Sequence, residues 1–138
     1  MNPSTKNPVI DLMEEQKTIT DKGGTMRLGA WTCDLKSGSI VSDVYKADSI
    51  SERHRHRYEF NSNYKTQIEE AGMLATGLNP DTGLGEIVEI PEHSWFVGVQ
   101  YHPEYKSTVA NPHPLFVAFV KAALNNHNKK KGVSMAQN

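Results

Sequence analysis

The chain of 138 residues has the length of one domain, and 37% of its residues are hydrophobic, so a packed core is possible. Fifteen Lys and Arg residues against sixteen Asp and Glu residues give a formal net charge of −1, which argues against nucleic acid or an anionic membrane as the main partner. No stretch approaches the roughly 20 apolar residues that a bilayer requires, and the amino terminus lacks the features of a signal peptide. The single cysteine, Cys33, excludes an intrachain disulfide framework, so the sequence predicts a cytoplasmic protein.

The first third of the chain predicts a loop followed by a hairpin. Residues 1–25 contain two prolines and a Gly-Gly pair, which favours a loop-rich entry. A strand is predicted over 25–35, and a Gly-containing turn leads to a second short strand over 39–45. The segment 51–61 is too polar for a core strand, so we expect an extended stretch that runs into a loop.

The middle of the chain predicts a short helix and two strands. Asn61 or Ser62 can cap the helix, and Gly72 stands where a left-handed residue after the last turn is expected. Strands are predicted over 73–78 and 85–90, and a turn containing Pro and Gly separates them.

The last third predicts the best core strand and the clearest helix. Residues 95–101 are apolar on both alternating faces, which is typical of a strand covered on both sides. A helix with a broad apolar stripe is predicted from Asn111, with Pro112 in its first turn. We expect one partial domain over 1–126 and a mobile polar tail over 127–138.

His102 and Glu104 form the strongest candidate for chemistry, because they follow the predicted core strand directly. Pro103 disfavours helical geometry at His102, so the chain leaves the strand extended and both side chains project to the same side. A carboxylate beside an imidazole fixes its tautomer and stabilises the imidazolium, as the base and orienter of a nucleophilic triad do. The alternative is a loop histidine that only packs or forms a hydrogen bond.

The segment Arg53-His54-Arg55-His56-Arg57 concentrates three guanidinium groups and two imidazoles. If it is extended, the arginines lie on one side and the histidines on the other. It could clamp a carboxylate or phosphate through the planar guanidinium fork, or play a buried or interfacial structural role with acids as partners. RNA binding is disfavoured because the sequence shows no wider basic surface around this segment. Zinc binding by His54, His56 and His102 is a distant third possibility, because the neighbouring arginines would repel a metal ion.

The glycine-rich segment and the single cysteine are weaker candidates for a functional site. The glycine-rich segment 23–29 lacks both the ending of a P-loop and the spacing of a dinucleotide fingerprint, although Thr25 and Arg27 could contact an anion. Cys33 lies within a predicted strand and lacks the flanking glycines of a nucleophile elbow, so we expect a small buried side chain. The sequence therefore predicts a base and its orienter without a nucleophile to activate.

Four segments together resemble the carboxyl-terminal part of the class I glutamine amidotransferase domain of CTP synthases. They are GGTMRLG at 23–29, SERHRHRYEFN at 51–61, VQYHPEY at 99–105 and HPLFVAFV at 113–120. The resemblance runs from about Pro8 to about Asn125. It implies an α/β fold in which this chain supplies the later strands and the final helix of a doubly wound, flavodoxin-like domain whose amino-terminal half is missing.

The resemblance also implies a function and roles for individual residues. The family makes CTP from UTP, ATP and glutamine, with Mg²⁺ and ATP used in a separate amidoligase domain, so no cofactor or metal is expected in this chain. Glutamine is hydrolysed by a Cys-His-Glu triad in which His102 matches the base and Glu104 its orienter, while Arg57 matches the arginine that holds glutamine. GTP is the activator, for which Thr25 and Arg27 are candidates, and the parent is expected to be a homotetramer.

The departure from the family pattern decides what we expect of this chain alone. The family's nucleophilic cysteine, oxyanion loop and amidoligase domain lie upstream of the segment that matches Pro8, so Met1–Asn7 is interpreted as a boundary within a longer parent. The isolated chain is therefore predicted to be inactive, marginally stable and prone to associate. The alternative is a non-catalytic binding or assembly module that uses the RHRHR segment and the apolar carboxyl-terminal helix.

Overall fold

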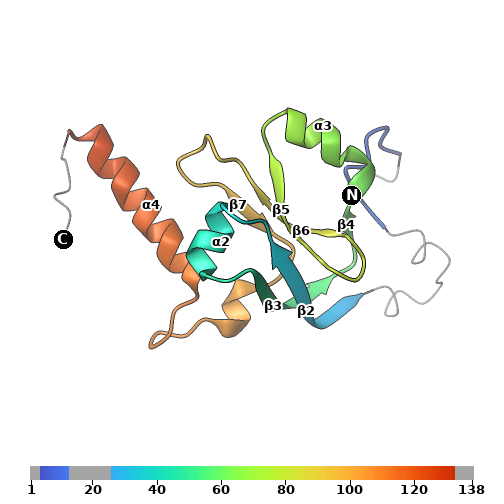
Figure 1. Ribbon diagram of the computed structural model, residues 1–138, viewed down its shortest axis with the longest axis horizontal. Helices are drawn as coiled ribbons and strands as arrows, with labels where there is room; N and C mark the ends of the chain where they lie inside the picture. The colour runs from blue at the N-terminus through green and yellow to red at the C-terminus, as the bar shows by residue number, and fades with distance from the viewer. Residues whose placement is uncertain (1–3, 13–25, 133–138) are drawn as a thin grey trace.

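The computed structural model describes residues 4–12 and 26–132. Its elements combine short helices and one helix of 17 residues with a five-stranded sheet (Figure 1). The strands are β1 (Ile10–Asp11), β2 (Arg27–Leu35), β3 (Ser49–His56), β4 (Glu59–Phe60), β5 (Leu74–Leu78), β6 (Gly85–Glu89) and β7 (Val97–Val99). The α-helices are α2 (Ile40–Tyr45), α3 (Lys65–Glu70) and α4 (Pro114–Lys130), and the 3₁₀-helices are η2 (Ser62–Tyr64) and η3 (Pro103–Lys106). Within these ranges, no helix is both long enough and apolar enough to span a bilayer.

The strands of the main sheet lie in the order β3-β2-β5-β6-β7, and each neighbouring pair is antiparallel. β1 and β4 form a separate antiparallel pair. The connections from β5 to β6 and from β6 to β7 are shorter than the crossover that parallel neighbours need, so antiparallel pairing is the available solution. In Figure 1, α2 lies between the sheet and α4, while α3 lies beside β5 on the other side of the molecule.

The buried apolar core is small and forms where α2 and the first turn of α4 meet the sheet. Only one residue of each of these helices is buried, Val41 in α2 and Leu115 in α4. The buried cluster comprises Cys33, Leu35, Val41, Ile87, Tyr101 and Leu115. Tyr101 belongs to this cluster and immediately precedes His102, so the core reaches the candidate catalytic segment.

Several predicted elements are confirmed. Strands occupy most of the predicted ranges 25–35, 73–78 and 85–90. The predicted helix is a 3₁₀ turn continued by α3, the Asn61 side chain caps it by accepting a hydrogen bond from the backbone N–H of Asn63, and Gly72 follows it with φ +95°.

The strand predicted over 39–45 is wrong, because this segment forms the helix α2. The Ser39 hydroxyl caps it by accepting from the N–H of Ser42, and the buried carboxylate of Glu89 accepts hydrogen bonds from the N–H groups of Ile40 and Val41, each at 2.9 Å. These acceptors satisfy three N–H groups that a first helical turn otherwise leaves unpaired. The decisive carboxylate comes from β6, 48 residues along the chain from Val41.

The segment 51–61 was expected to be an extended stretch, too polar for a core strand, that runs into a loop; its first part is extended, but it forms the edge strand β3 of the main sheet. β3 pairs with β2 from Asp34 opposite Ser49 to Arg27 opposite His56. Its inward side chains, Glu52 and His54, are buried and polar. The strand tolerates them because other buried polar side chains lie beside them, as described below.

The predicted core strand over 95–101 is also corrected. The strand itself covers only Val97–Val99, is half-buried, and lies at the edge of the sheet. Within the described residues it has a strand neighbour only on the β6 side, so it is an edge strand and not the core strand that was predicted.

The final helix differs from its prediction at both ends and on its apolar face. It starts at Pro114, three residues after the expected start, and the His113 ring caps it. It continues to Lys130 and so includes the beginning of the segment expected to be a tail. Five large apolar side chains of α4 are exposed: Phe116, Val117, Phe119, Val120 and Leu124. Figure 1 shows the far half of this helix extending away from the sheet.

Candidate active site

The candidate catalytic pair is formed. His102 Nδ1 lies 2.7 Å from Glu104 Oε1, and their side chains are 36% and 55% exposed. Because a carboxylate only accepts hydrogen bonds, Nδ1 carries the proton and donates it, which leaves Nε2 as the basic nitrogen of the neutral ring. Hydrogen bonding to His102 lowers the pKa of Glu104, so this carboxylate is ionised at neutral pH. The arrangement is that of a base with its orienter.

The backbone explains why the two side chains meet. His102 is extended, with φ −111° and ψ 90°, as predicted for a residue that precedes proline. Pro103 then starts η3, which turns Glu104 back toward the imidazole. The N–H of His102 donates to the carbonyl of Arg53 at 2.9 Å, and the Tyr105 ring stacks on the His102 ring with centroids 5.0 Å apart.

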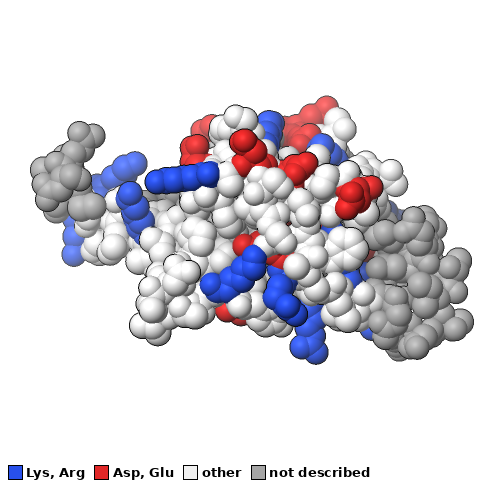
Figure 2. All heavy atoms as spheres, turned by 60° about the horizontal axis from the view of Figure 1, so that its bottom comes forward, with Lys and Arg blue, Asp and Glu red and all other residues white. Residues whose placement is uncertain are grey.

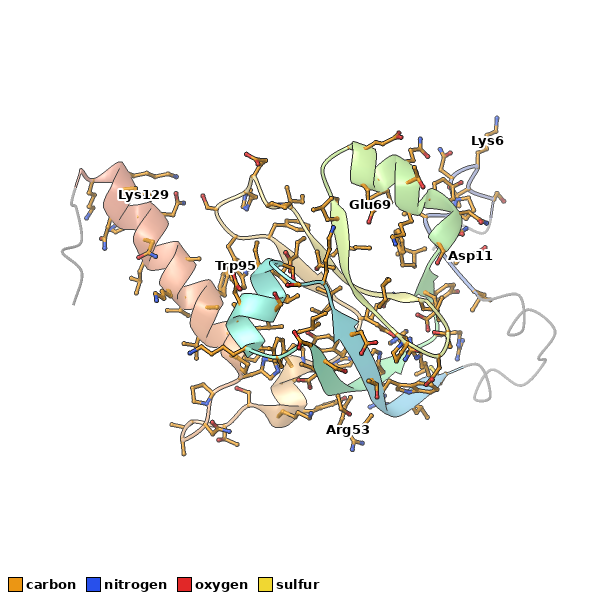
Figure 3. All side chains as sticks on the ribbon, viewed as in Figure 1. Lys6, Asp11, Arg53, Glu69, Trp95 and Lys129 are labelled. Carbon is orange, nitrogen blue, oxygen red and sulfur yellow. The ribbon has the colours of Figure 1, made fainter. Side chains whose placement is uncertain are left out.

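The RHRHR segment separates its side chains as its alternation predicts. Arg53 and Arg55 are exposed, whereas His54 is buried and His56 is largely buried. Figure 3 shows Arg53 projecting away from the sheet, and Figure 2 shows basic side chains gathered on the face to which β3 and η3 contribute. Arg57 is half-buried in the bend that joins β3 to β4.

A network of buried charged side chains lies between β2, β3, β4 and β6. Arg27 Nη2 lies 2.6 Å from Glu86 Oε1, and its Nη1 lies 3.6 Å from Glu59 Oε2. Burial raises the pKa of Glu59 to about 7 and also raises that of Glu86, while the Arg27 guanidinium opposes both shifts. One guanidinium thus faces two buried carboxylates.

The two histidines of this network are hydrogen-bonded to each other. His54 Nδ1 lies 2.8 Å from His56 Nε2, and His56 Nδ1 lies 3.2 Å from the Tyr58 carbonyl. Because a carbonyl only accepts, His56 carries its proton on Nδ1, and His54 donates to its free Nε2. Burial lowers the pKa of both rings, that of His54 to about 3, so the pair is neutral at pH 7.

The geometry also bears on the remaining candidates for metal and effector binding. Among the described residues, the group with metal-ligand spacing is His54, His56 and Glu86, whose ligand atoms lie within 4.8 Å of one another, and His102 is not a member. Of the two effector candidates, Thr25 lies outside the described residues. Arg27 is buried in the network, with its guanidinium 4.5 Å from the Trp31 ring.

Cys33 is the buried side chain that its sequence context predicts. It is 0% exposed within the core cluster, and burial raises its pKa to about 12. A thiol with this pKa stays protonated at neutral pH, so it is neither accessible nor nucleophilic.

A group of side chains around Glu52, which was not predicted from the sequence, lies next to the pair's segment. The Glu52 carboxylate accepts a hydrogen bond from the Tyr45 hydroxyl. His113 and Lys106 also contact this carboxylate, and the Tyr101 hydroxyl contacts that of Tyr45. The alternation of the SERHRH stretch, which places Glu52 on the buried face with His54, was the available indication.

Comparison with known proteins gives consistent results. The family model "Glutamine amidotransferase class-I" matches residues 6–122. The chain is 66% identical over 137 residues to a CTP synthase of Christiangramia forsetii and 64% identical over 129 residues to one of Flavobacterium johnsoniae. These matches cover 99% and 94% of this chain but only 25% and 24% of the relatives. The chain therefore spans about a quarter of the length of these curated relatives.

A solved structure gives the same result for the fold. The chain matches the glutaminase domain of Trypanosoma brucei CTPS with bound acivicin at a TM-score of 0.81 and 33% identity. The match covers 90% of this chain and 48% of that one, which confirms the expected partial domain and its α/β fold class. Because the family model matches residues 6–122, which are most of the chain, the chain belongs to the class I glutamine amidotransferase family.

Proposed function

We propose that the chain supplies the base and orienter of glutamine hydrolysis in a CTP synthase. The observation that carries the proposal is the His102–Glu104 hydrogen bond of 2.7 Å, which leaves Nε2 of a neutral imidazole free to accept a proton. In this role His102 takes the proton of a cysteine thiol, and Glu104 stabilises the imidazolium that forms. The thiolate then attacks the side-chain amide carbon of glutamine, and the C–N bond breaks as the imidazolium gives its proton to the departing ammonia. Water hydrolyses the resulting thioester to glutamate and frees the thiol.

Arg57 and the glycine-rich segment complete the proposed site. Arg57 holds the carboxylate of substrate glutamine through its planar guanidinium fork. For GTP, we propose Thr25 and Arg27, with Arg27 acting as a transmitter, because its guanidinium is buried against Glu59 and Glu86. The ammonia released passes to an amidoligase domain that uses ATP and Mg²⁺ to aminate UTP. We propose that the parent enzyme is a homotetramer located in the cytoplasm.

We propose that this chain alone is inactive, because a second segment must supply the nucleophile. Cys33, the only cysteine of the chain, is buried and protonated. The edge strand β7 and the exposed apolar face of α4 border a hollow of about 350 Å³, lined by residues that include Trp95, Leu115 and Phe119. This chain covers 48% of the matched glutaminase domain, so the remainder of such a domain is the proposed occupant of that surface.

Complementation tests the proposal. The purified chain is assayed for glutamate release from glutamine alone and after mixing with a polypeptide that carries the rest of a class I domain. Activity is expected only in the mixture, and His102→Ala is expected to lower its kcat about 100-fold or more. Lys36→Met, at an exposed position in the turn after β2 and away from the proposed docking surface on α4, is the matched control and should leave the rate unchanged. Hydrolysis by the chain alone that His102→Ala abolishes would contradict its inactivity.

The second candidate function is a non-catalytic assembly module, favoured by the same exposed face of α4. Calorimetry with glutamine and light scattering of the purified chain separate the two functions. Stable self-association in which the complementing polypeptide neither binds nor restores hydrolysis would favour the module.

A further inference from the structure

The carboxylate of Glu52 lies beneath the segment that carries the candidate pair. Glu52 projects inward from β3 and is 3% exposed. It does not belong to the Arg27 network, because the contacts described for its carboxylate are with Tyr45, Lys106 and His113. A carboxylate buried this deeply is costly unless several donors surround it.

The first contact fixes the carboxyl-terminal side of the pair. Lys106 Nζ lies 3.5 Å from Glu52 Oε2 and also donates to the carbonyl of Ser51. Lys106 is the last residue of η3, two residues after Glu104. The ammonium therefore ties the end of η3 to β3.

The second set of contacts fixes the amino-terminal side. The Tyr45 hydroxyl donates to Glu52 Oε1 at 3.2 Å and lies 3.1 Å from the Tyr101 hydroxyl. Tyr101 immediately precedes His102, and its backbone bridges to His54. Burial raises the pKa of both tyrosines, so both hydroxyls keep their protons as donors.

The third contact adds the start of α4. His113 Nδ1 accepts from the N–H of Leu115, so its proton lies on Nε2, which donates to Glu52 Oε1 at 3.1 Å. The N–H of His113 in turn donates to the Ser107 hydroxyl, next to η3. One carboxylate thus joins α2, η3 and α4 to β3.

We infer that Glu52 is a positioning residue for the His102–Glu104 pair, an inference that rests on the proposed function. Ion pairs between exposed side chains are weak, so the His102 and Glu104 side chains, at 36% and 55% exposure, need support from the surrounding structure to keep one arrangement. Glu52 holds both ends of the segment from Tyr101 to Lys106. Because both ends are held, the His102 and Glu104 side chains keep a single arrangement, in which the Nδ1–H of His102 points at the Glu104 carboxylate.

The test uses the full chain and variants that differ in one contact. Lys106 is 45% exposed, so Lys106→Met removes the tie to Glu52 at little expected cost to the core. Lys106→Arg keeps a cation there, and Lys121→Met removes an exposed lysine elsewhere. Glu52→Gln keeps the side-chain volume and removes the charge.

The readout is the tautomer of His102, measured from the ¹⁵N resonances of its ring above pH 8, with circular dichroism to verify folding. The wild-type chain and Lys121→Met should show mainly the Nδ1–H form. Lys106→Met and Glu52→Gln should raise the Nε2–H population about threefold or more, whereas Lys106→Arg should restore the wild-type ratio. If circular dichroism shows that Glu52→Gln does not fold, Lys106→Met alone decides the comparison.

The same variants in the complemented enzyme provide a second readout. Lys106→Met should lower kcat about tenfold while the KM for glutamine stays unchanged, because a misplaced base affects the chemical step. A wild-type tautomer ratio in folded Lys106→Met overturns the role of Glu52. The tautomer is measured without turnover, so failure of complementation would count against the proposed function and leave this result to decide the inference.

Discussion

Two buried groups of the network give the stability of the chain opposite dependences on pH. Burial places the pKa of His54 at about 3, below its usual 6.5, and that of Glu59 at about 7, above its usual 4.5. The folded state thus binds the His54 proton less tightly than the unfolded state does, so stability is lost as pH falls below 6.5. It binds the Glu59 proton more tightly, so stability is gained as pH falls through 7.

The magnitudes of the two effects nearly cancel. Between pH 7 and pH 5, linkage gives a loss of about 2 kcal/mol from His54 and a gain of about 2 kcal/mol from Glu59. His56 and Glu86 shift in the same two directions and therefore oppose each other as well. The wild-type free energy of unfolding should accordingly change little from these groups over this range.

Substituting His54 or Glu59 alone should reveal the pH dependence of the free energy of unfolding that the other residue contributes. His54→Asn keeps an N–H donor without a titrating ring, so its free energy of unfolding should rise by about 2 kcal/mol from pH 7 to pH 5 relative to the wild-type change. Glu59→Gln should fall by about 2 kcal/mol on the same scale. Each variant is compared with itself by urea denaturation at pH 7, 6 and 5, followed by circular dichroism at constant ionic strength. His93→Asn, at an exposed histidine, is the control.

The slopes decide the outcome. If His54→Asn and Glu59→Gln both follow the wild-type profile, the two side chains do not titrate as their burial requires. If either slope has the opposite sign, the assignment of charge within the network is refuted.

Three further predictions concern packing, capping and the thiol. A Cβ at Gly77 would lie 2.6 Å from Ile87 Cγ1 and 2.7 Å from Cys33 Sγ, so Gly77→Ala should cost about 1–3 kcal/mol in a urea titration, and an unchanged midpoint would contradict this packing. Glu89→Ala removes the acceptor for two N–H groups of α2 and should cost about 1–3 kcal/mol with loss of helical circular dichroism; wild-type stability would show that the cap is dispensable. Cys33 should resist iodoacetamide in buffer and react in urea, whereas rapid native labelling, detected by mass spectrometry, would contradict its burial.

Features with local determinants could be predicted from the sequence. The cap at Asn61 and the left-handed glycine at Gly72 bracket a short helix, because each acts on backbone groups within a few residues. The extended backbone at His102 is equally local, since Pro103 restricts the residue before it. Segments of this kind carry the determinants of their backbone conformation in their own sequence.

Features that depend on distant partners could not be predicted. β-branched residues at the start of α2 favour a strand, and the carboxylate of Glu89, together with the Ser39 cap, favours the helix instead. Glu52 and His54 made the segment 51–61 look too polar for a core strand, because Tyr45 and Glu86, which contact them, come from other elements. The buried position of Arg27 was missed for the same reason, since Glu59 and Glu86 lie far from it in sequence.

The strand order has a consequence for how the chain folds. In the order β3-β2-β5-β6-β7, three of the four pairings join strands consecutive along the chain, and only the pairing of β2 with β5 does not. Loop closure costs little for such local pairs, so topology of this kind favours rapid folding. We therefore expect the sheet to assemble from two nuclei, β2 with β3 and β5 with β6 and β7. The slow step would then be the docking of these nuclei through the short ladder between Asp34–Leu35 and Gly77–Leu78.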